Sequence, residues 1–317
     1  MRRRHFVIAG GAFAVTLPFP ARSSARGRIV YLRSGSAPSS FEQAFILGLR
    51  DLGYVDGRDF ALEFFTVTAD KVESTVEMLR GGAHDILVAA GTPAVIVAMR
   101  AAGDRAIIFV SSDPIHLNLV SNYARPGSRM TGLSLVSPEL NRKRLELLKD
   151  LVPTLSKVGI LFSATNPAGR STMELARQAA SELRLDVALV PVARGGFEAG
   201  IAEARAADAG AALVLSQGQT LSADGRYGSA VRYKMPTAFT SGGFVKGGGL
   251  MSFGPDVMEV YRRLAYYATQ ILKGASPTDL PVELPTKFEF VLNLKTARDL
   301  EIEVPAHLHV FADEVIE

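Results

Sequence analysis

The sequence predicts an α/β fold made of two similar lobes, each with a parallel sheet covered by helices on both faces. From Arg28 onward, short strands rich in Val, Ile and Leu alternate with amphipathic segments, the pattern of a sheet buried on both faces. The order of the strand-to-loop junctions also recurs at a nearly constant offset. A length of 317 residues with 48% hydrophobic residues suits about two domains and excludes a disordered chain.

The expected strands are short apolar runs bounded by turn-forming or charged residues, as buried parallel strands are. They cover residues 28–33, 60–67, 85–90, 106–111, 158–163, 186–192, 211–215, 237–240, 250–253 and 288–294. The expected helices repeat their apolar residues every three or four positions. They cover residues 40–52, 72–80, 94–101, 138–151, 170–183, 198–207, 256–273 and 296–300. The helix at 138–151 has leucines at 140, 145, 148 and 151 with charges elsewhere, and we expect it at the first crossover between the lobes.

Three junctions recur in order at offsets of 130, 127 and 130 residues. They pair VYLRSG (30–35) with ILFSAT (160–165), ILVAAGTP (86–93) with LVLSQGQT (213–220), and IIFVSSD (107–113) with TAFTSGG (237–243). The alternative is the loose likeness that any α/β strands share. A repeat predicts an N-terminal lobe over 26–150, joined through a crossover by part of 255–317, and a C-terminal lobe over 151–254.

The N-terminal 25 residues have the organisation of an export signal peptide. Arg2 to His5 form a positive region, residues 6–17 an apolar run, and Ser23 to Ala25 a small-residue cleavage site. The arginine pair also resembles a twin-arginine motif, so the export route stays open. Without this segment 31 bases face 32 acids, which removes the electrostatic reason to expect nucleic acid or an anionic membrane as partner. We expect a soluble periplasmic protein without membrane insertion.

Several enzyme classes are excluded by missing residues and motifs. The chain has no cysteine, so disulfides, thiolate metal sites and cysteine nucleophiles are impossible. Walker, nucleophile-elbow, H-E-x-x-H and dinucleotide-binding motifs are absent too. We therefore predict no catalytic residue, no metal and no cofactor.

Small polar residues follow the expected strands, where open α/β sheets bind ligands. Thr92, Asp113 and Asn166 each precede a proline, the pattern of a helix N-cap, and such a helix start suits a carboxylate. Each is as readily a structural cap as a ligand group. The candidate ligand-binding residues at these ends are Ser34, Gly35, Gly91, Thr92, Pro93, Ala94, Ser111, Ser112, Asp113, Thr165, Asn166, Ser216, Gln217, Gly218, Ser241 and Gly242.

Two further candidates lie near the last expected helix. Phe253 ends a strand and is either a wall of an apolar pocket or a core residue. Asp256 either pairs with a ligand ammonium group or caps the helix that follows it.

Five long segments resemble the substrate-binding proteins of ABC transporters, in particular those of tryptophan- and tyrosine-type uptake systems. The segments are FILGLRDLGYVDGRDFALEF (45–64), DILVAAGTPA (85–94), SDPIHLNLVSNYARPGSRMTGLS (112–134), SPELNRKRLELLKDLVP (137–153) and LPTKFEFVLNLKTARDLEIEVP (284–305), followed by ADEVIE (312–317). The resemblance implies two Rossmann-like lobes of the type 1 periplasmic-binding-protein kind, a ligand cleft between them and no enzymatic activity. It assigns the ligand to residues 91–94 and 111–113 of one lobe and to Thr165 and Asn166 of the other.

The resemblance also implies an aromatic or large apolar amino acid as ligand, bound by hinge closure and delivered by a monomer to a permease and its ATPase. One position departs from the family pattern. After the strand at 211–215 the family usually has an acidic residue for an ammonium group, whereas this chain has Gln217. A neutral or acidic organic ligand is therefore an alternative. A periplasmic ligand-sensing domain and a two-lobe transferase-type enzyme are the alternative functions.

Overall fold

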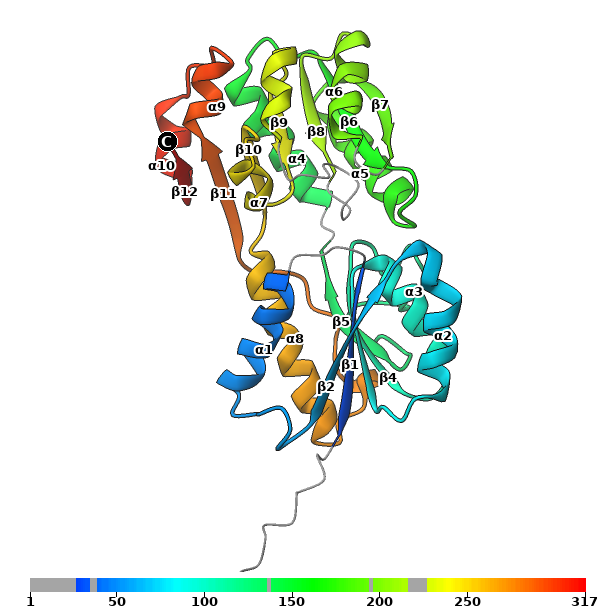
Figure 1. The fold of residues 1–317 in the computed structure, drawn as a ribbon. Coiled ribbons are helices and arrows are strands. Elements are labelled where there is room, and N and C mark those ends of the chain that lie inside the picture. Colours follow the sequence, from blue (N-terminus) through cyan, green and yellow to red (C-terminus); the bar gives the residue numbers. More distant parts are fainter. Residues whose placement is uncertain (1–26, 35–38, 136–137, 194–195, 216–226) are drawn as a thin grey trace, which may run out of the picture.

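The computed structural model describes residues 27–34, 39–135, 138–193, 196–215 and 227–317. The predicted signal peptide and the candidates Gly35, Ser216, Gln217 and Gly218 lie outside these ranges. The described chain forms two α/β lobes, one above the other in Figure 1, and each contains one sheet.

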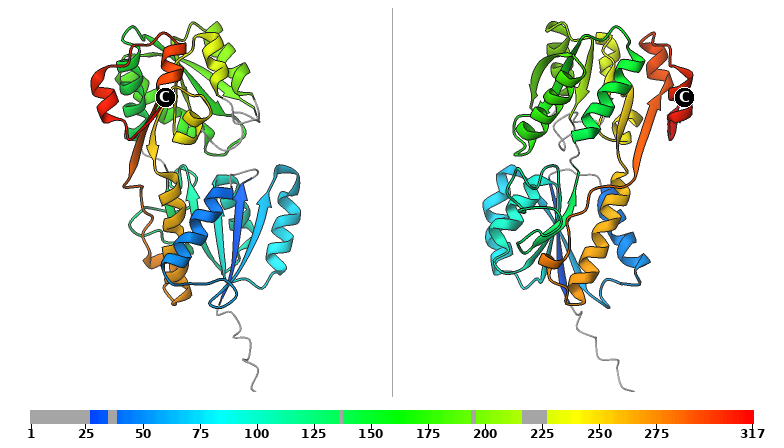
Figure 2. Two further views of the ribbon diagram at one scale, coloured as in Figure 1. Left: turned by 60° about the vertical axis from the view of Figure 1, so that its left-hand side comes forward. Right: turned by 180° about the vertical axis from the view of Figure 1, so that it is seen from behind.

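The first lobe has a parallel sheet of five strands in the order β2-β1-β3-β4-β5. Its elements are β1 (Arg28–Ser34), α1 (Ser39–Asp51), β2 (Ala61–Val67), α2 (Val72–Gly81), β3 (Ile86–Ala90), α3 (Thr92–Ala101), β4 (Ala106–Ser111), β5 (Met130–Ser134) and, from far along the chain, α8 (Val257–Leu272). Alternate strand residues pack on opposite faces. One face packs against α1 and α8, and the other against α2 and α3 (Figure 2).

The second lobe has seven strands in the order β12-β11-β10-β9-β8-β6-β7. Its elements are α4 (Pro138–Leu151), β6 (Lys157–Ser163), α5 (Gly169–Glu182), β7 (Asp186–Val192), α6 (Phe197–Ala206), β8 (Ala211–Val214), β9 (Thr237–Phe239), α7 (Gly242–Lys246), β10 (Met251–Pro255), β11 (Phe288–Asn293), α9 (Leu294–Asp299), α10 (Ala306–Phe311) and β12 (Glu314–Ile316). Helices α4 and α5 share one buried cluster with the sheet, and α6 shares a second on the opposite face.

The sheet orders confirm the predicted internal repeat. Strands β7-β6-β8-β9-β10 of the second sheet occupy the same positions as β2-β1-β3-β4-β5 of the first, and the three matched junctions follow β1 and β6, β3 and β8, and β4 and β9. Two features differ from the prediction. The pair of β10 and β11 is antiparallel, and α4 packs on the second sheet although the predicted first lobe extended to residue 150.

Among the described strands and α-helices, four were not predicted: β5, α7, α10 and β12. Strand β5 reads Met-Thr-Gly-Leu-Ser, with a central glycine in place of the β-branched residues that signal a strand. A Cβ at Gly132 would overlap the carbonyl oxygen of Phe109 on the neighbouring strand, so this approach requires glycine. The other three have at most six residues each, too few for a periodic signal.

The chain crosses between the lobes in three places among the described elements. It passes from β5 to α4, from β10 to α8, and from Glu283 to β11 (Figure 1). The last of these crossings is hydrogen-bonded to β5 at its first end and to β10 at its second. Glu283 bridges β5, donating its N–H to Gly132 O at 3.0 Å and accepting from Ser134 N at 3.0 Å, whereas Phe288 pairs with Pro255 of β10. Residues 284–287 therefore run from the first crossing segment to the second.

Candidate functional site

The carboxyl ends of the parallel strands of both sheets face the opposite lobe. Strand β5 ends at Ser134 and the chain then enters the second lobe, while β10 ends at Pro255 and the chain then enters the first (Figure 2). Because all strands of the first sheet are parallel to β5, and β6, β8 and β9 to β10, their carboxyl ends lie at the same edges. We call these two edges the carboxyl edges; they hold the described candidate residues.

In the first lobe, hydrogen bonds link the ends of β1, β3 and β4. Ser34 Oγ donates to Ala90 O at 3.0 Å and accepts from Ala94 N at 3.1 Å. The hydroxyls of Thr92 and Ser111 lie 3.4 Å apart, and Ser111 Oγ also lies 3.4 Å from Asp113 N. The structure thus brings Ser34, residues 91–94 and residues 111–113 together at one edge of the sheet, as predicted from the strand ends, with Thr92, Ser111 and Asp113 buried there.

In the second lobe, the turn after β6 is organised by a buried serine. Ser163 Oγ accepts from Asn166 N at 3.1 Å and lies 3.3 Å from Thr165 Oγ1. Thr165 is exposed at this edge. Ser241 and Gly242 are half-buried after β9 at the start of the short helix α7, and a Cβ on Gly242 would come within 2.8 Å of Val291.

The predicted N-caps are only partly correct. Thr92 is the first residue of α3 rather than its cap, and its hydroxyl contacts Ser111 instead; Gly91, with φ of 92°, precedes the helix. Asp113 accepts from His116 N at 3.2 Å, which stabilises a turn and not an α-helix. Asn166 Oδ1 accepts from Ala168 N at 2.9 Å, one turn ahead of α5. Proline identifies these turns from sequence, but not the residue at which a helix begins.

Phe253 and Asp256 both have structural partners. The Phe253 ring stacks with Phe288 and Phe311 at centroid distances of 6.1 and 6.4 Å, so it belongs to an aromatic cluster on β10, β11 and α10. Asp256 caps α8, with its Oδ1 accepting from Glu259 N at 3.0 Å. The capping alternative for Asp256 is therefore confirmed.

Arg144 of α4 is a buried cation that the sequence reasoning missed. It is 5% exposed; its Nε donates to Phe253 O at 2.6 Å and its Nη1 to Asn141 Oδ1 at 2.7 Å. Burial lowers its pKa to about 9, and no described carboxylate forms an ion pair with it. The signal was present in the spacing, since position 144 is four residues from both Leu140 and Leu148 and so shares their buried face.

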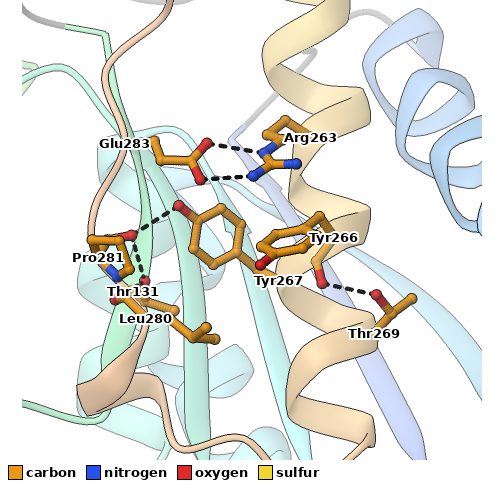
Figure 3. Close-up of polar contacts among 8 residues, drawn as sticks. All are labelled: Thr131, Arg263, Tyr266, Tyr267, Thr269, Leu280, Pro281 and Glu283. Atoms are coloured by element: carbon orange, nitrogen blue, oxygen red, sulfur yellow. Dashed lines mark hydrogen bonds and ion pairs between the residues drawn. The ribbon is translucent and has the colours of Figure 1, made fainter.

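A second arginine stabilises the crossing segments on the side of the first lobe. Arg263 of α8 forms two hydrogen bonds with the Glu283 carboxylate, at 2.9 and 2.8 Å, and its guanidinium lies 3.9 Å from the Tyr266 ring centroid (Figure 3). The pKa of Glu283 is lowered by this arginine. Tyr267 donates to Pro281 O at 2.8 Å, so α8 is joined to the segment that leads into the third crossing.

Neither a metal site nor a membrane-spanning helix is found among the residues that the structure describes. In these ranges no group of three or more His, Asp or Glu side chains has the arrangement of a metal site. In the same ranges no helix is both long and apolar enough to cross a bilayer.

Two α/β lobes with facing carboxyl edges, connected by three crossings, define the class of type 1 periplasmic-binding-protein-like folds. Residues 29–316 match the family described as ABC transporter substrate binding protein, so the chain belongs to that family. It is thus a substrate-binding protein of an ABC transporter.

Two similar proteins agree with this assignment, and a third shares the fold. A tyrosine-binding protein of Clostridioides difficile is 25% identical over 290 residues, which are 83% of this chain and 76% of that protein. An ABC domain from Streptococcus pneumoniae, solved in complex with L-Trp, is 26% identical with a TM-score of 0.83 over 92% of this chain and 99% of that chain. A conserved domain protein from Vibrio cholerae is 23% identical with the same TM-score and the same two coverages, which shows the shared fold.

Proposed function

We propose that the chain binds a small organic ligand between the two carboxyl edges, closes on it by rotation about the crossings, and delivers it to the permease of an ABC uptake transporter. The ligand class we favour is an aromatic or large apolar amino acid, or a related carboxylate. The observation that carries this proposal is the gathering of polar side chains at the facing carboxyl edges: Ser34, Thr92, Ser111 and Asp113 in the first lobe, and Thr165 in the second.

The chemistry of the two edges suits such a ligand. Hydroxyl groups and backbone N–H groups bind carboxylate and amide groups in a fixed orientation, and contacts made to both lobes stabilise the closed state in proportion to their number. The two similar proteins named for tyrosine or solved with L-Trp support the amino-acid class. Binding and release need no covalent step, and we propose that the protein is not an enzyme.

The setting of the protein forms part of the same proposal. Residues 1–25 serve as a signal peptide, and the remaining chain acts in the periplasm as a monomer that docks on a permease with its ATPase. Growth of a strain lacking this protein on a growth-limiting amount of the identified ligand tests the uptake role. Impaired growth that the full-length gene restores is the expected result, and unimpaired growth would contradict a role in uptake.

The binding proposal is tested with the chain from residue 26 onward and isothermal titration calorimetry. The panel contains L-tyrosine, L-tryptophan, L-phenylalanine, L-leucine, phenylacetate, glucose and myo-inositol. We expect a dissociation constant in the micromolar range or below for at least one aromatic amino acid or carboxylate. Binding of a sugar alone would replace the ligand class, and no heat with any compound would contradict the binding proposal for this panel.

A further inference from the structure

A buried arginine ordinarily has an acidic partner, and no acid among the described residues pairs with the guanidinium of Arg144. The other arginines that pack near the carboxyl edge of the first lobe or its crossings are paired, Arg33 with Glu42 and Arg263 with Glu283. Arg144 is more deeply buried than either, and its two printed acceptors are neutral oxygens. A buried charge without a counter-charge is costly, so this site favours an anion from outside the described chain.

Arg144 retains N–H donors on both terminal nitrogens that have no acceptor among the described residues. A guanidinium carries five N–H donors. Phe253 O takes the Nε–H and Asn141 takes one Nη1–H, which leaves three donors, one on Nη1 and both on Nη2, without an acceptor among the described residues. Nη2, with both its N–H groups unused, can donate to a carboxylate, and a guanidinium binds that group more strongly than it binds a neutral oxygen.

Nη2 lies beside the end of strand β10. A Cβ added to Gly254 would come within 3.4 Å of Nη2 and would overlap the carbonyl oxygen of Thr240, which directly follows β9. The guanidinium therefore lies near the end of β10, at the carboxyl edge of the second lobe. Glycine at position 254 permits the close approach of Thr240 O at the end of the neighbouring strand.

Arg105 shows what a purely structural arginine looks like in the same chain. Its Nε, Nη1 and Nη2 donate to four backbone carbonyls, those of Leu79, Gly82, Ala101 and Ala102, at 2.7 to 3.0 Å. Those carbonyls lie at the ends of α2 and α3, so Arg105 satisfies helix ends far from the carboxyl edge. All three nitrogens of Arg105 are thus used to cap helices, whereas Arg144 keeps N–H groups that have no acceptor among the described residues and can bind a ligand.

We propose that Arg144 is the residue of the second lobe that binds the ligand's carboxylate, with Asn141 and Phe253 O holding the plane of its guanidinium. This inference rests on the proposed function and deepens it, because it requires a carboxylate group on the ligand and assigns that group to one side chain. It also means that the ligand's negative group lies near the end of β10, leaving the hydroxyl-rich edge of the first lobe for its remaining polar groups.

The test compares matched ligands and matched variants. L-tyrosine and L-tryptophan are titrated against their decarboxylated forms, tyramine and tryptamine, and against the corresponding amino-acid amides. The same titrations are made with Arg144→Lys, Arg144→Met and the control Arg105→Met, each checked for folding by circular dichroism. The wild-type ligand comparison needs no variant, so it can still overturn the proposal if Arg144→Met does not fold, and Arg144→Lys then tests the residue.

We expect the amine and amide analogues to bind the wild type roughly 100-fold more weakly than the amino acids, with a similar loss for amino acids in Arg144→Met. Arg144→Lys, which keeps the charge but not the guanidinium, is expected to lose less, and Arg105→Met should leave affinity unchanged. Equal binding of amines and amino acids, or wild-type affinity in folded Arg144→Met, would overturn the role of Arg144 while leaving the proposed function intact. No binding by any compound would overturn both.

Discussion

Replacing Glu283 by Gln is the sharpest test of how the crossing segments are held to the first lobe. The change removes the charge that faces Arg263 but keeps the two backbone hydrogen bonds between Glu283 and β5. The side chains of Glu283 and Arg263 are 33% and 41% exposed, so the pair lies between a surface ion pair and a buried one. We therefore expect Glu283→Gln to lower the free energy of unfolding by about 1 kcal/mol at pH 7.

The pH dependence has a definite sign. Arg263 holds the pKa of Glu283 below the ordinary 4.5, so the folded chain favours the charged carboxylate. The stabilisation is complete above the unfolded-state pKa and is lost as the pH falls through the lowered pKa of the folded state. The difference between wild type and Glu283→Gln should therefore shrink as the pH is lowered from 5 toward 3.

The assay is urea denaturation of wild type, Glu283→Gln, Arg263→Met and the double variant, followed by circular dichroism. Arg263→Met should cost more than Glu283→Gln because it also removes the contact with the Tyr266 ring. The coupling energy from the four proteins should be about 1 kcal/mol at pH 7. A coupling energy near zero at pH 7, or a Glu283→Gln difference that does not change with pH, would refute the reasoning.

Three further predictions concern stability. Leu148→Ala should lower the free energy of unfolding, measured by urea denaturation, by about 2–5 kcal/mol, because Leu148 is 0% exposed in the core of the second lobe. The control Leu47→Ala, at a site 49% exposed, should change it by less than about 0.5 kcal/mol. Asp256→Ala should cost about 1 kcal/mol through the lost cap of α8, and Asp256→Asn should restore most of it in the same assay. Burial lowers the pKa of His84 below 6.5, so the wild type should lose stability as the pH falls below 6.5, and thermal melts of His84→Leu should lack that dependence.

Most of the fold could be predicted from the sequence, because each strand and helix of the repeated unit has a local pattern of apolar and polar residues. Helix 138–151 matches α4 at both ends, and the three repeated junctions fall on equivalent strands. Local patterns do not show which strand pairs with which, or on which sheet a helix packs. The antiparallel pairing of β10 with β11, and the placement of α4 on the second sheet, are decided by contacts between residues distant in sequence.

The candidate site follows the same division. Strand ends predict that Ser34, Thr92 and Ser111 lie together, because parallel strands end at one edge. Arg144 was not found, since a charged residue in a helix rich in charges is ordinarily solvent-exposed. Its burial depends on the approach of β10, which becomes visible only when helix and strand are placed side by side.

The course of residues 284–287 has a mechanical consequence. This short segment starts beside β5, where Glu283 is bonded to Gly132 and Ser134, and ends beside β10, where Phe288 pairs with Pro255. A short segment that is fixed to the first lobe at one end and to the second lobe at the other limits sliding of one lobe past the other. It still allows the lobes to rotate about its two ends. The connection thus favours tilting of the lobes over shear.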